Sequence, residues 1–436
     1  MMMTEITNWK RNTAWFLIGK GITLFGSMLV HYAIMWHITL ETQSGLMMTL
    51  ITVAGALPMF FISPFGGVWA DRYSKKYIIN ISDAIIAAVT LVMAVLFALE
   101  FKYIGLLLAC LVVRALGQGV QMPAFNALVP EIVPQEHLTR INGISGGLQS
   151  FVMFASPMAG AAVLAIAPIH MLMFIDVVTA AIGVSILAFL VKAPARSPIA
   201  NPVAGVKQYF VEIGEGIKYV AGRKFLKRVL ILSAIFNFMA APVAVMTPLQ
   251  VARNYGDDIW TVFSGLSFGA EQRLAALEVV FFAGMTLGGL LIGIWGGFRN
   301  KSHTMALSTC LMGVGALGLG LVTNFWVYLL IMGFLGIVMN MFNPPMMATL
   351  QTNVDSEYMG RVFSVLMMMG SLMMPLGMVL WGPLGDVVDI GWLLVVSGVF
   401  LFLMGFTFVF DKTLLAAGAP KTAAEDMGNT GTVSPG

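Results

Sequence analysis

Long apolar runs alternate with short polar segments along almost the whole chain. Twelve of these runs are bounded by charged residues, prolines or polar clusters, and each is close to the ~20 residues that a membrane-spanning helix needs. They cover residues 13–38, 46–70, 78–99, 104–129, 141–167, 171–191, 229–251, 274–297, 304–322, 325–350, 362–384 and 392–410. The pattern predicts an all-α integral membrane protein with twelve transmembrane helices.

The composition supports this interpretation. Hydrophobic residues make up 58% of the chain and charged residues 10%, whereas a water-facing exterior needs roughly a quarter of its residues charged. This composition makes the lipid bilayer the expected surrounding of the chain. The net charge of +3 is too small to indicate a nucleic-acid partner. Cys110 and Cys310 fall inside apolar runs, where a thiol behaves as a small hydrophobe, and they indicate no disulfide framework.

The basic residues predict how the chain is oriented. If the N-terminus is cytoplasmic, nineteen of the 24 Lys and Arg residues lie on the cytoplasmic side and three on the opposite side, while Lys20 and Arg114 lie within spans. Cytoplasmic loops of membrane proteins carry an excess of Lys and Arg. We therefore expect a multi-pass protein of the cell membrane with both termini in the cytoplasm.

One long polar segment divides the spans into two groups of six. Residues 193–228 begin with several prolines and continue with apolar residues at helical spacing, namely Phe210, Ile213, Ile217 and Val220. This spacing predicts an amphipathic helix on the cytoplasmic face. The predicted units are an N-terminal six-helix bundle (1–192), a cytoplasmic linker with this helix (193–228), a C-terminal six-helix bundle (229–411) and a disordered cytoplasmic tail (412–436).

The two groups of spans resemble each other. Pro123 and Pro344 are 221 positions apart, and so are Arg140 and Arg361; in both groups an acidic segment lies between the proline and the arginine. Repeats of this kind are typical of transporters that bind a substrate between two halves. We therefore expect two pseudo-symmetric six-helix bundles around a central cavity.

A charged turn connects the second and third runs. Gly66 and Gly67 would allow another helix to approach closely, and Asp71 could pair with a cation or a helix N-terminus of the other half in one conformation only. The predicted conformational lock comprises Gly67, Asp71, Arg72, Lys75 and Lys76. The alternative is a turn that stops translocation and carries ordinary cytoplasmic charge.

The same turn, GVWADRYSKK over residues 67–76, resembles the signature loop of the major facilitator superfamily. A second copy, WGGFRNK over residues 295–301, lacks the acid. Residues 123–134 (PAFNALVPEIVP), 138–143 (LTRING) and 359–364 (MGRVFS) are similar to the drug:proton antiporter group, which contains macrolide-efflux proteins and siderophore exporters. The resemblance implies export of small molecules, driven by protons.

Ionisable residues inside membrane spans are costly and are therefore functional candidates. Arg114 resembles the fourth-span arginine that this family links to proton transfer; alternatively, it hydrogen-bonds backbone carbonyls in the bundle. Asp176 and Glu278 are candidate proton carriers, because burial favours the neutral form of a carboxyl group. Asp83 lies near the inner surface, where a salt bridge with the charged turn is favoured over proton carriage. Lys20 could face the cavity or extend to the inner surface.

Other polar residues within the spans could form hydrogen bonds with a substrate. Together with Lys20, the predicted cavity residues are Gln118, Gln121, Asn126, Gln149, Asn237, Asn340 and Asn343. In the fifth span, ASPMAG over residues 155–160 resembles the Gly- and Pro-rich segment of exporters in this superfamily. Pro157 would kink the helix and Gly160 would allow close packing, which predicts a hinge; a simple packing kink is the alternative.

The sequence shows no pattern typical of an enzyme. It has no phosphate-binding Gly-x-x-x-x-Gly-Lys-(Ser/Thr) loop, no cluster of His, Cys and Asp at metal-ligand spacing and no nucleophile elbow, so we expect no cofactor and no metal. The predicted function is proton-coupled export of hydrophobic or amphipathic small molecules by a monomer, through alternating access. The alternatives are export of an endogenous siderophore or lipid-like metabolite, an importer, and a non-transporting membrane receptor or assembly factor.

Overall fold

The computed structural model describes residues 9–101, 103–134, 137–164, 166–192, 204–255, 269–355 and 358–419. The first half contains α1 (Trp9–Thr42), α2 (Gly45–Arg72), α3 (Lys75–Ala98), α4 (Ile104–Ile132), α5 (Leu138–Leu164), α6 (Ile169–Ser185) and the π-helical turn η2 (Ile186–Leu190). After α7 (Ala204–Gly222), the second half contains α8 (Lys224–Ala241), η3 (Pro242–Met246), α9 (Thr247–Asn254), α10 (Ala270–Trp295), α11 (Lys301–Leu321), α12 (Phe325–Asn353), α13 (Met359–Val387), α14 (Ile390–Phe410) and α15 (Lys412–Gly418).

Twelve helical segments of the described residues are long and apolar enough to cross a membrane, which confirms the twelve predicted spans. The seventh span combines α8, η3 and α9 into the single segment Lys224–Asn254. Several helices extend beyond the apolar runs, as α1 does from Trp9 to Thr42. The reason is that backbone hydrogen bonding continues through polar residues outside the hydrocarbon layer, where hydropathy gives no signal.

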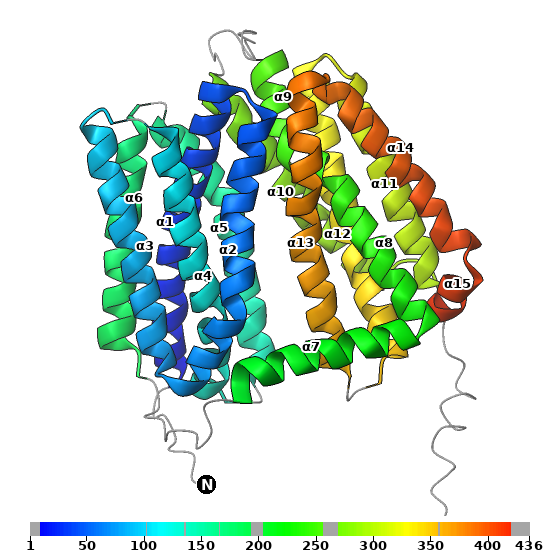
Figure 1. Ribbon diagram of the computed structural model, residues 1–436, viewed down its shortest axis with the longest axis horizontal. Helices are drawn as coiled ribbons and strands as arrows, with labels where there is room; N and C mark the ends of the chain where they lie inside the picture. The colour runs from blue at the N-terminus through cyan, green and yellow to red at the C-terminus, as the bar shows by residue number, and fades with distance from the viewer. Residues whose placement is uncertain are drawn as a thin grey trace, which may run out of the picture.

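The spans form two bundles that lie side by side, α1 to α6 in one and α8 to α14 in the other (Figure 1). Corresponding pairs of helices pack in each bundle: α2 on α4 and α3 on α6 in the first, and α10 on α12 and α11 on α14 in the second. Between the bundles, α2 packs on α13 and α5 packs on α10. The two contacts are equivalent, because each joins the second span of one half to the fifth span of the other. The bundles are therefore pseudo-symmetric.

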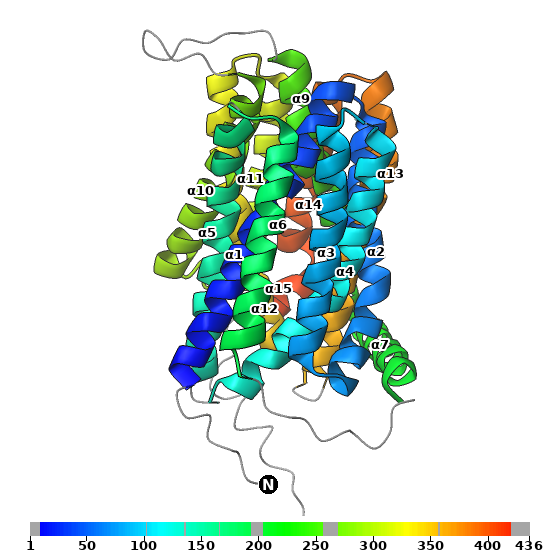
Figure 2. The same cartoon turned by 90° about the vertical axis from the view of Figure 1, so that its left-hand side faces the viewer.

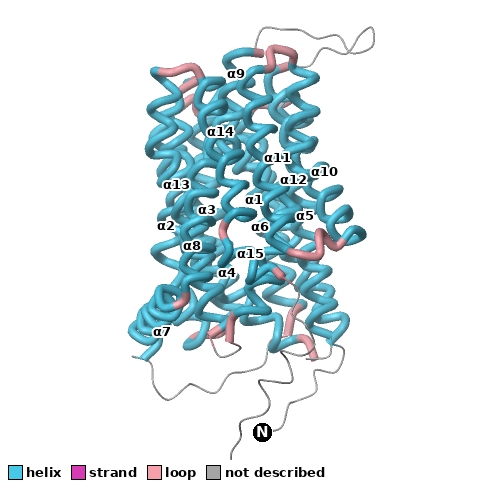
Figure 3. The backbone as a smooth tube through the Cα atoms, turned by 90° about the vertical axis from the view of Figure 1, so that its right-hand side faces the viewer, coloured by secondary structure: helices cyan, strands magenta, loops and turns pink. Residues whose placement is uncertain are grey.

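The two ends of the molecule differ in how closely the bundles approach. We call the end where α7 lies and α1 begins the α7 face, and the opposite end the α9 face (Figures 1 and 2). Figure 3, which views the second bundle, also shows α7 and α9 at opposite ends. The ribbons of α2 and α13 are close together at the α9 face and diverge toward the α7 face (Figure 1). The contact of α2 with α13 therefore lies near the α9 face.

The helix α7 is attached to the second bundle through side chains at its C-terminal end. The rings of Tyr219 and Tyr358 stack with their centroids 4.3 Å apart. Arg223 pairs with Asp355 at 2.5 Å, and Tyr219 also donates a hydrogen bond to Asp355 at 2.9 Å. These contacts hold α7 against the segment between α12 and α13.

The chain is still helical just after residue 411, in the segment that the composition predicts to be disordered. Lys412–Gly418 form α15, whose N-terminus is capped by the Asp411 carboxylate through the N–H groups of Thr413 at 2.8 Å and Leu414 at 3.4 Å. Leu414 is buried between helices of the second bundle. A cap and one buried side chain hold this short helix, and neither is visible as an apolar period. Residues 193–203 of the linker and 420–436 of the tail lie outside the described residues.

Two glycines allow close contacts between helices. A Cβ atom added to Gly66 of α2 would lie 2.7 Å from Cα of Val120 on α4. A Cβ atom added to Gly382 of α13 would collide with Oγ1 of Thr49 on α2, which donates to the Met378 carbonyl at 2.7 Å. The first contact packs α2 inside its own bundle, and the second joins the two bundles.

Replacing Gly66 by Ala should lower the melting temperature of the purified protein, because the added methyl group meets the backbone of α4. Overpacking of this kind costs about 1–3 kcal/mol. Gly67 is the matched control, since nothing lies within 4 Å of a Cβ atom at that position. Thermal unfolding of Gly66→Ala and Gly67→Ala in detergent measures the difference, and equal melting temperatures would contradict this packing.

Candidate functional site

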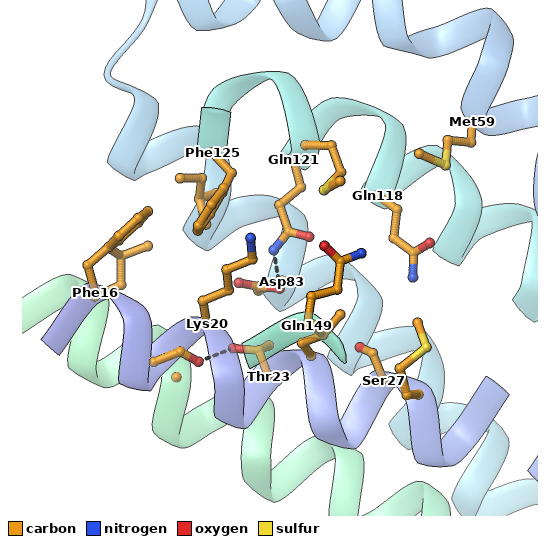
Figure 4. A pocket seen from close by; sticks show the side chains of 17 residues that line it. Phe16, Lys20, Thr23, Ser27, Met59, Asp83, Gln118, Gln121, Phe125 and Gln149 are labelled. Carbon is orange, nitrogen blue, oxygen red and sulfur yellow. Dashed lines mark hydrogen bonds between the residues drawn. The ribbon is translucent and has the colours of Figure 1, made fainter. Parts of the chain in front are cut away.

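A cavity of about 160 Å³ lies within the first bundle, in the half nearer the α7 face. Polar side chains from four helices line it: Lys20 of α1, Asp83 of α3, Gln118 and Gln121 of α4, and Gln149 of α5. Phe and Met side chains form much of the remaining wall. Figure 4 shows that the polar groups converge on one space. The structure thus brings together four of the eight residues that the sequence suggested for a cavity.

The ammonium group of Lys20 is held inside this cavity. Its Nζ atom lies 3.4 Å from the centroid of the Phe125 ring and donates to Ser145 Oγ at 3.4 Å. A cation over the face of an aromatic ring is attracted by the ring's negative face. Of the two orientations that the sequence left open for Lys20, the structure has the one toward the cavity.

Asp83 lies in the cavity wall and not at the charged turn where the sequence suggested a salt bridge. Its Oδ1 accepts a hydrogen bond from Gln121 Nε2 at 2.6 Å, and the residue is 6% exposed. Asp83 shares the buried face of α3 with Ile79 and Ile86. The spacing of these three positions along the helix is the signal that could have shown that Asp83 points into the bundle.

A buried ion pair lies beside the cavity. Arg114 Nη1 of α4 is 2.6 Å from Asp176 Oδ2 of α6, and the two residues are 3% and 1% exposed. Arg114 also donates to Thr90 Oγ1 at 2.5 Å and to the Ser27 carbonyl at 3.1 Å. Ser27 Oγ donates to the other oxygen of Asp176 at 3.4 Å. Removing either charge would leave its partner buried and uncompensated.

A second cavity, of about 340 Å³, lies farther toward the α9 face and is lined by both bundles. His31, Arg114 and Gln118 come from the first bundle, and Glu278 of α10 comes from the second. Gln118 lines both cavities, and Ser27, which accepts from Arg114, lines the first. The Arg114–Asp176 pair therefore lies between the two cavities, and Glu278 lines the second one.

The other four cavity candidates do not line either of these two cavities. Asn237 donates to a carbonyl of its own helix at 2.8 Å, and Asn340 donates to a carbonyl of α10 at 2.7 Å. Asn126 and Asn343 are exposed. Among the described residues, no group of three or more His, Cys, Asp and Glu side chains could hold a metal ion.

The two hinge candidates, Pro157 and Gly160, are buried within α5. A Cβ atom on Gly160 would lie 3.7 Å from Leu29 and from Trp36 of α1, which is ordinary van der Waals contact. Packing in this conformation therefore does not require glycine at position 160.

The charged turn is attached to the first bundle. Lys75 forms an ion pair with Glu131 of α4, and Lys76 Nζ donates to two backbone carbonyls at the end of the sixth span, each at 2.8 Å. The side chains of Asp71 and Arg72 lie outside the part of the chain that the structure describes. The two lysines therefore connect α3 to α4 and to the end of the sixth span.

Hydrogen bonds join the two bundles at the α9 face, through residues that the sequence analysis missed. The Asp386 carboxylate at the end of α13 accepts from the N–H groups of Gly45 at 2.6 Å and Leu46 at 2.9 Å, and from Ser44 Oγ at 2.9 Å. Arg253 of α9 donates to the same carboxylate at 2.9 Å. A carboxylate satisfies the free N–H groups of a helix N-terminus and interacts favourably with the helix dipole. We call Ser44, Arg253 and Asp386 the α9-face latch.

Comparison with known proteins agrees with this architecture. The model of the transmembrane secretion effector family, a branch of the major facilitator superfamily, matches residues 11–428. Macrolide efflux protein A of Streptococcus pyogenes is 27% identical over 400 residues, which cover 91% of this chain and 95% of that protein. The staphyloferrin A transporter of Staphylococcus aureus is 22% identical over 408 residues, which cover 91% and 96%.

Among solved structures, a crystal structure of a POT family transporter in complex with a thioalcohol-conjugated peptide superposes with a TM-score of 0.73. The two chains are 14% identical, and the match covers 93% of this chain and 96% of that one, which shows a common fold. The twelve spans in two bundles, the charged turn and the family match over residues 11–428 lead to one conclusion. The chain belongs to the transmembrane secretion effector family of the major facilitator superfamily, and it is a multi-pass membrane transporter of the efflux type.

Proposed function

We propose that the protein is a proton-coupled exporter of hydrophobic or amphipathic small molecules that works by alternating access. The observation that carries this proposal is the buried Arg114–Asp176 pair between one cavity inside the first bundle and another lined by both bundles. Neutralising Asp176 with a proton would free Arg114 to find another partner, because a buried charge without one is costly. Protonation would thereby break the side-chain link between α4 and α6.

Each acidic candidate has a place in this mechanism. Glu278 faces the second cavity and would take up the proton there. Asp176 would receive it next, and Arg114 would transmit the change to α1 and α3 through its hydrogen bonds to Ser27 and Thr90. The substrate would bind in the first cavity, between Lys20 and the glutamines.

We propose that the α7 face is cytoplasmic, so that this structure is an inward-facing conformation. The excess of basic residues on the loops of that face supports the assignment. Cysteines introduced at the exposed Lys218 of α7 and Val387 of α13 test it in intact cells. A membrane-impermeant maleimide should label Val387→Cys and leave Lys218→Cys unlabelled, and the reverse pattern would invert the topology.

Export can be tested directly in cells. Cells that express the protein should accumulate less of a radiolabelled macrolide than cells without it, and a protonophore should abolish the difference. Equal accumulation with and without the protein would favour a non-transporting receptor or assembly factor. If the difference in macrolide accumulation persisted in the presence of the protonophore, export would not be coupled to protons.

Export of an endogenous siderophore is the second candidate. The similarity to the staphyloferrin A transporter supports it, and the Lys20 ammonium in the cavity could pair with a substrate carboxylate. Siderophore release from cells that lack and cells that express the protein would separate it from macrolide export.

We propose that the charged turn closes the α7 face in the opposite conformation. Replacing Asp71 by Asn should then shift the population toward the inward-facing conformation, because Asp71 is the acid that the second turn at residues 295–301 lacks. Arg299→Gln in that second turn is the control. Distances between spin labels on α3 and α11 at the α7 face measure the shift, and equal shifts in the two variants would argue against the lock.

A further inference from the structure

The Lys20 side chain lies among the polar and aromatic side chains that line the first cavity (Figure 4). We propose that Lys20 is an intramolecular ligand whose ammonium occupies the place of an organic cation, so that a cationic substrate with an apolar body binds when Lys20 withdraws. The inference rests on the proposed function, because it assigns a substrate class and a specificity-determining residue to the same cavity.

Lys20 covers one face of an aromatic ring in the cavity wall. Its Nζ lies 3.4 Å from the Phe125 centroid, well inside the ~6 Å within which a cation is attracted to a ring. Phe16 stacks on the same ring with centroids 4.6 Å apart and an interplanar angle of 15°. One face of Phe125 is therefore packed against Phe16, and the other is available to a cation.

Asp83 adds a carboxylate to the lining of the same cavity. Asp83 is 6% exposed, and the hydrogen bond from Gln121 fixes its carboxylate at the cavity surface. In Figure 4 the Lys20 ammonium lies between the Phe125 ring and the side chains of Gln121 and Asp83. An aromatic face with a buried carboxylate held one helical turn away, at Gln121, is a recognition site for a cation, and in this structure the protein supplies that cation itself.

The first cavity is small in this conformation. The cavity of about 160 Å³ is smaller than the ~300–1,000 Å³ that small-molecule sites usually have. The aminobutyl chain of Lys20 forms part of the cavity wall and ends over the Phe125 ring (Figure 4), so its withdrawal would enlarge the space and free the ring together. Met28, Met59 and Met122 also line the cavity, and their flexible side chains can adapt to a larger guest.

Two probe ions of the same shape and opposite charge test the inference. Binding of tetraphenylphosphonium and tetraphenylborate to the purified full-length protein is measured by equilibrium dialysis. Lys20→Met should bind tetraphenylphosphonium three- to tenfold more tightly than wild type and tetraphenylborate no more tightly. The double variant Lys20→Met/Asp83→Asn should lose the gain. Lys218→Met, which removes an exposed cation of α7, should leave both affinities unchanged.

Three outcomes would overturn the inference: unchanged or weaker tetraphenylphosphonium binding by Lys20→Met, an equal gain for both ions, and no binding of the phosphonium by either protein. Lys20→Gln serves as a second variant if Lys20→Met is not monodisperse. Proton-driven export by the wild type is measured separately. If the wild type exports but Lys20→Met binds the phosphonium no more tightly than the wild type, only the inference about Lys20 is wrong. If Lys20→Met binds it more tightly but the wild type does not export, only the proposed function is wrong.

Discussion

Replacing Arg114 by Met should abolish proton-driven export and also lower the thermal stability of the purified protein. The substitution leaves the Asp176 carboxylate 1% exposed with one remaining side-chain donor, Ser27, at 3.4 Å. Breaking a buried ion pair from one side costs about 3–5 kcal/mol, much of it the penalty of the uncompensated charge. Arg114→Met should therefore have a clearly lower melting temperature than the wild type, as thermal unfolding in detergent measures.

The double variant Arg114→Met/Asp176→Leu separates structure from mechanism. Removing both charges restores an apolar interior, which is often as stable as the ion pair it replaces. We expect its melting temperature to return close to that of the wild type while export stays absent. Arg140→Gln on the exposed end of α5 is the control for loss of one positive charge. Wild-type export by the double variant would show that the pair is structural.

Replacing Asp386 by Asn should shift the protein toward a conformation open at the α9 face. Asp386 accepts two backbone N–H groups and the Ser44 hydroxyl from α2, as well as a hydrogen bond from Arg253. Hydrogen bonds to a charged group contribute about 1.5–3 kcal/mol. Because Asp386 and Arg253 are 30% and 26% exposed, solvent screening lowers this to about 1–2 kcal/mol. That corresponds to a 5–30-fold change in the ratio of the two conformations.

Spin labels at Glu41 of α1 and Val387 of α13 measure this shift, because both residues are exposed at the α9 face. A longer mean distance is expected in Asp386→Asn than in the wild type. Asp389→Asn is a matched control: Asp389 caps α14 through the N–H of Gly391 at 2.8 Å, and both residues belong to the second bundle. If both substitutions, or neither, lengthened the distance, the α9-face latch would not control the opening.

The spans could be predicted from the sequence because their signal is local. About twenty apolar residues in a row are enough to identify a spanning helix, and all twelve were found. Hydropathy does not show which face of such a helix points into the bundle, because lipid-facing and core-facing side chains are both apolar. This explains why Asn237 and Asn340, chosen for polarity alone, bind backbone carbonyls instead of lining a cavity.

The partners of the candidate residues depend on tertiary structure and could not be predicted. Arg114 and Asp176 are marked by their charge, yet nothing in the sequence relates two residues on separate spans. The same holds for the contact of Ser44 with Asp386, which are 342 positions apart. Asp83 is the exception, since its spacing with Ile79 and Ile86 on α3 already places it on an inward face.

In the proposed mechanism, a proton passes through the Arg114–Asp176 pair each time a substrate molecule is exported. The most direct test is proton movement in liposomes that contain the purified protein, an acidic lumen and a trapped pH-sensitive dye. Addition of a macrolide outside should raise the luminal pH in the wild type and leave it unchanged in Arg114→Met/Asp176→Leu. No macrolide-dependent rise in the wild type, or an equal rise in the double variant, would contradict the account.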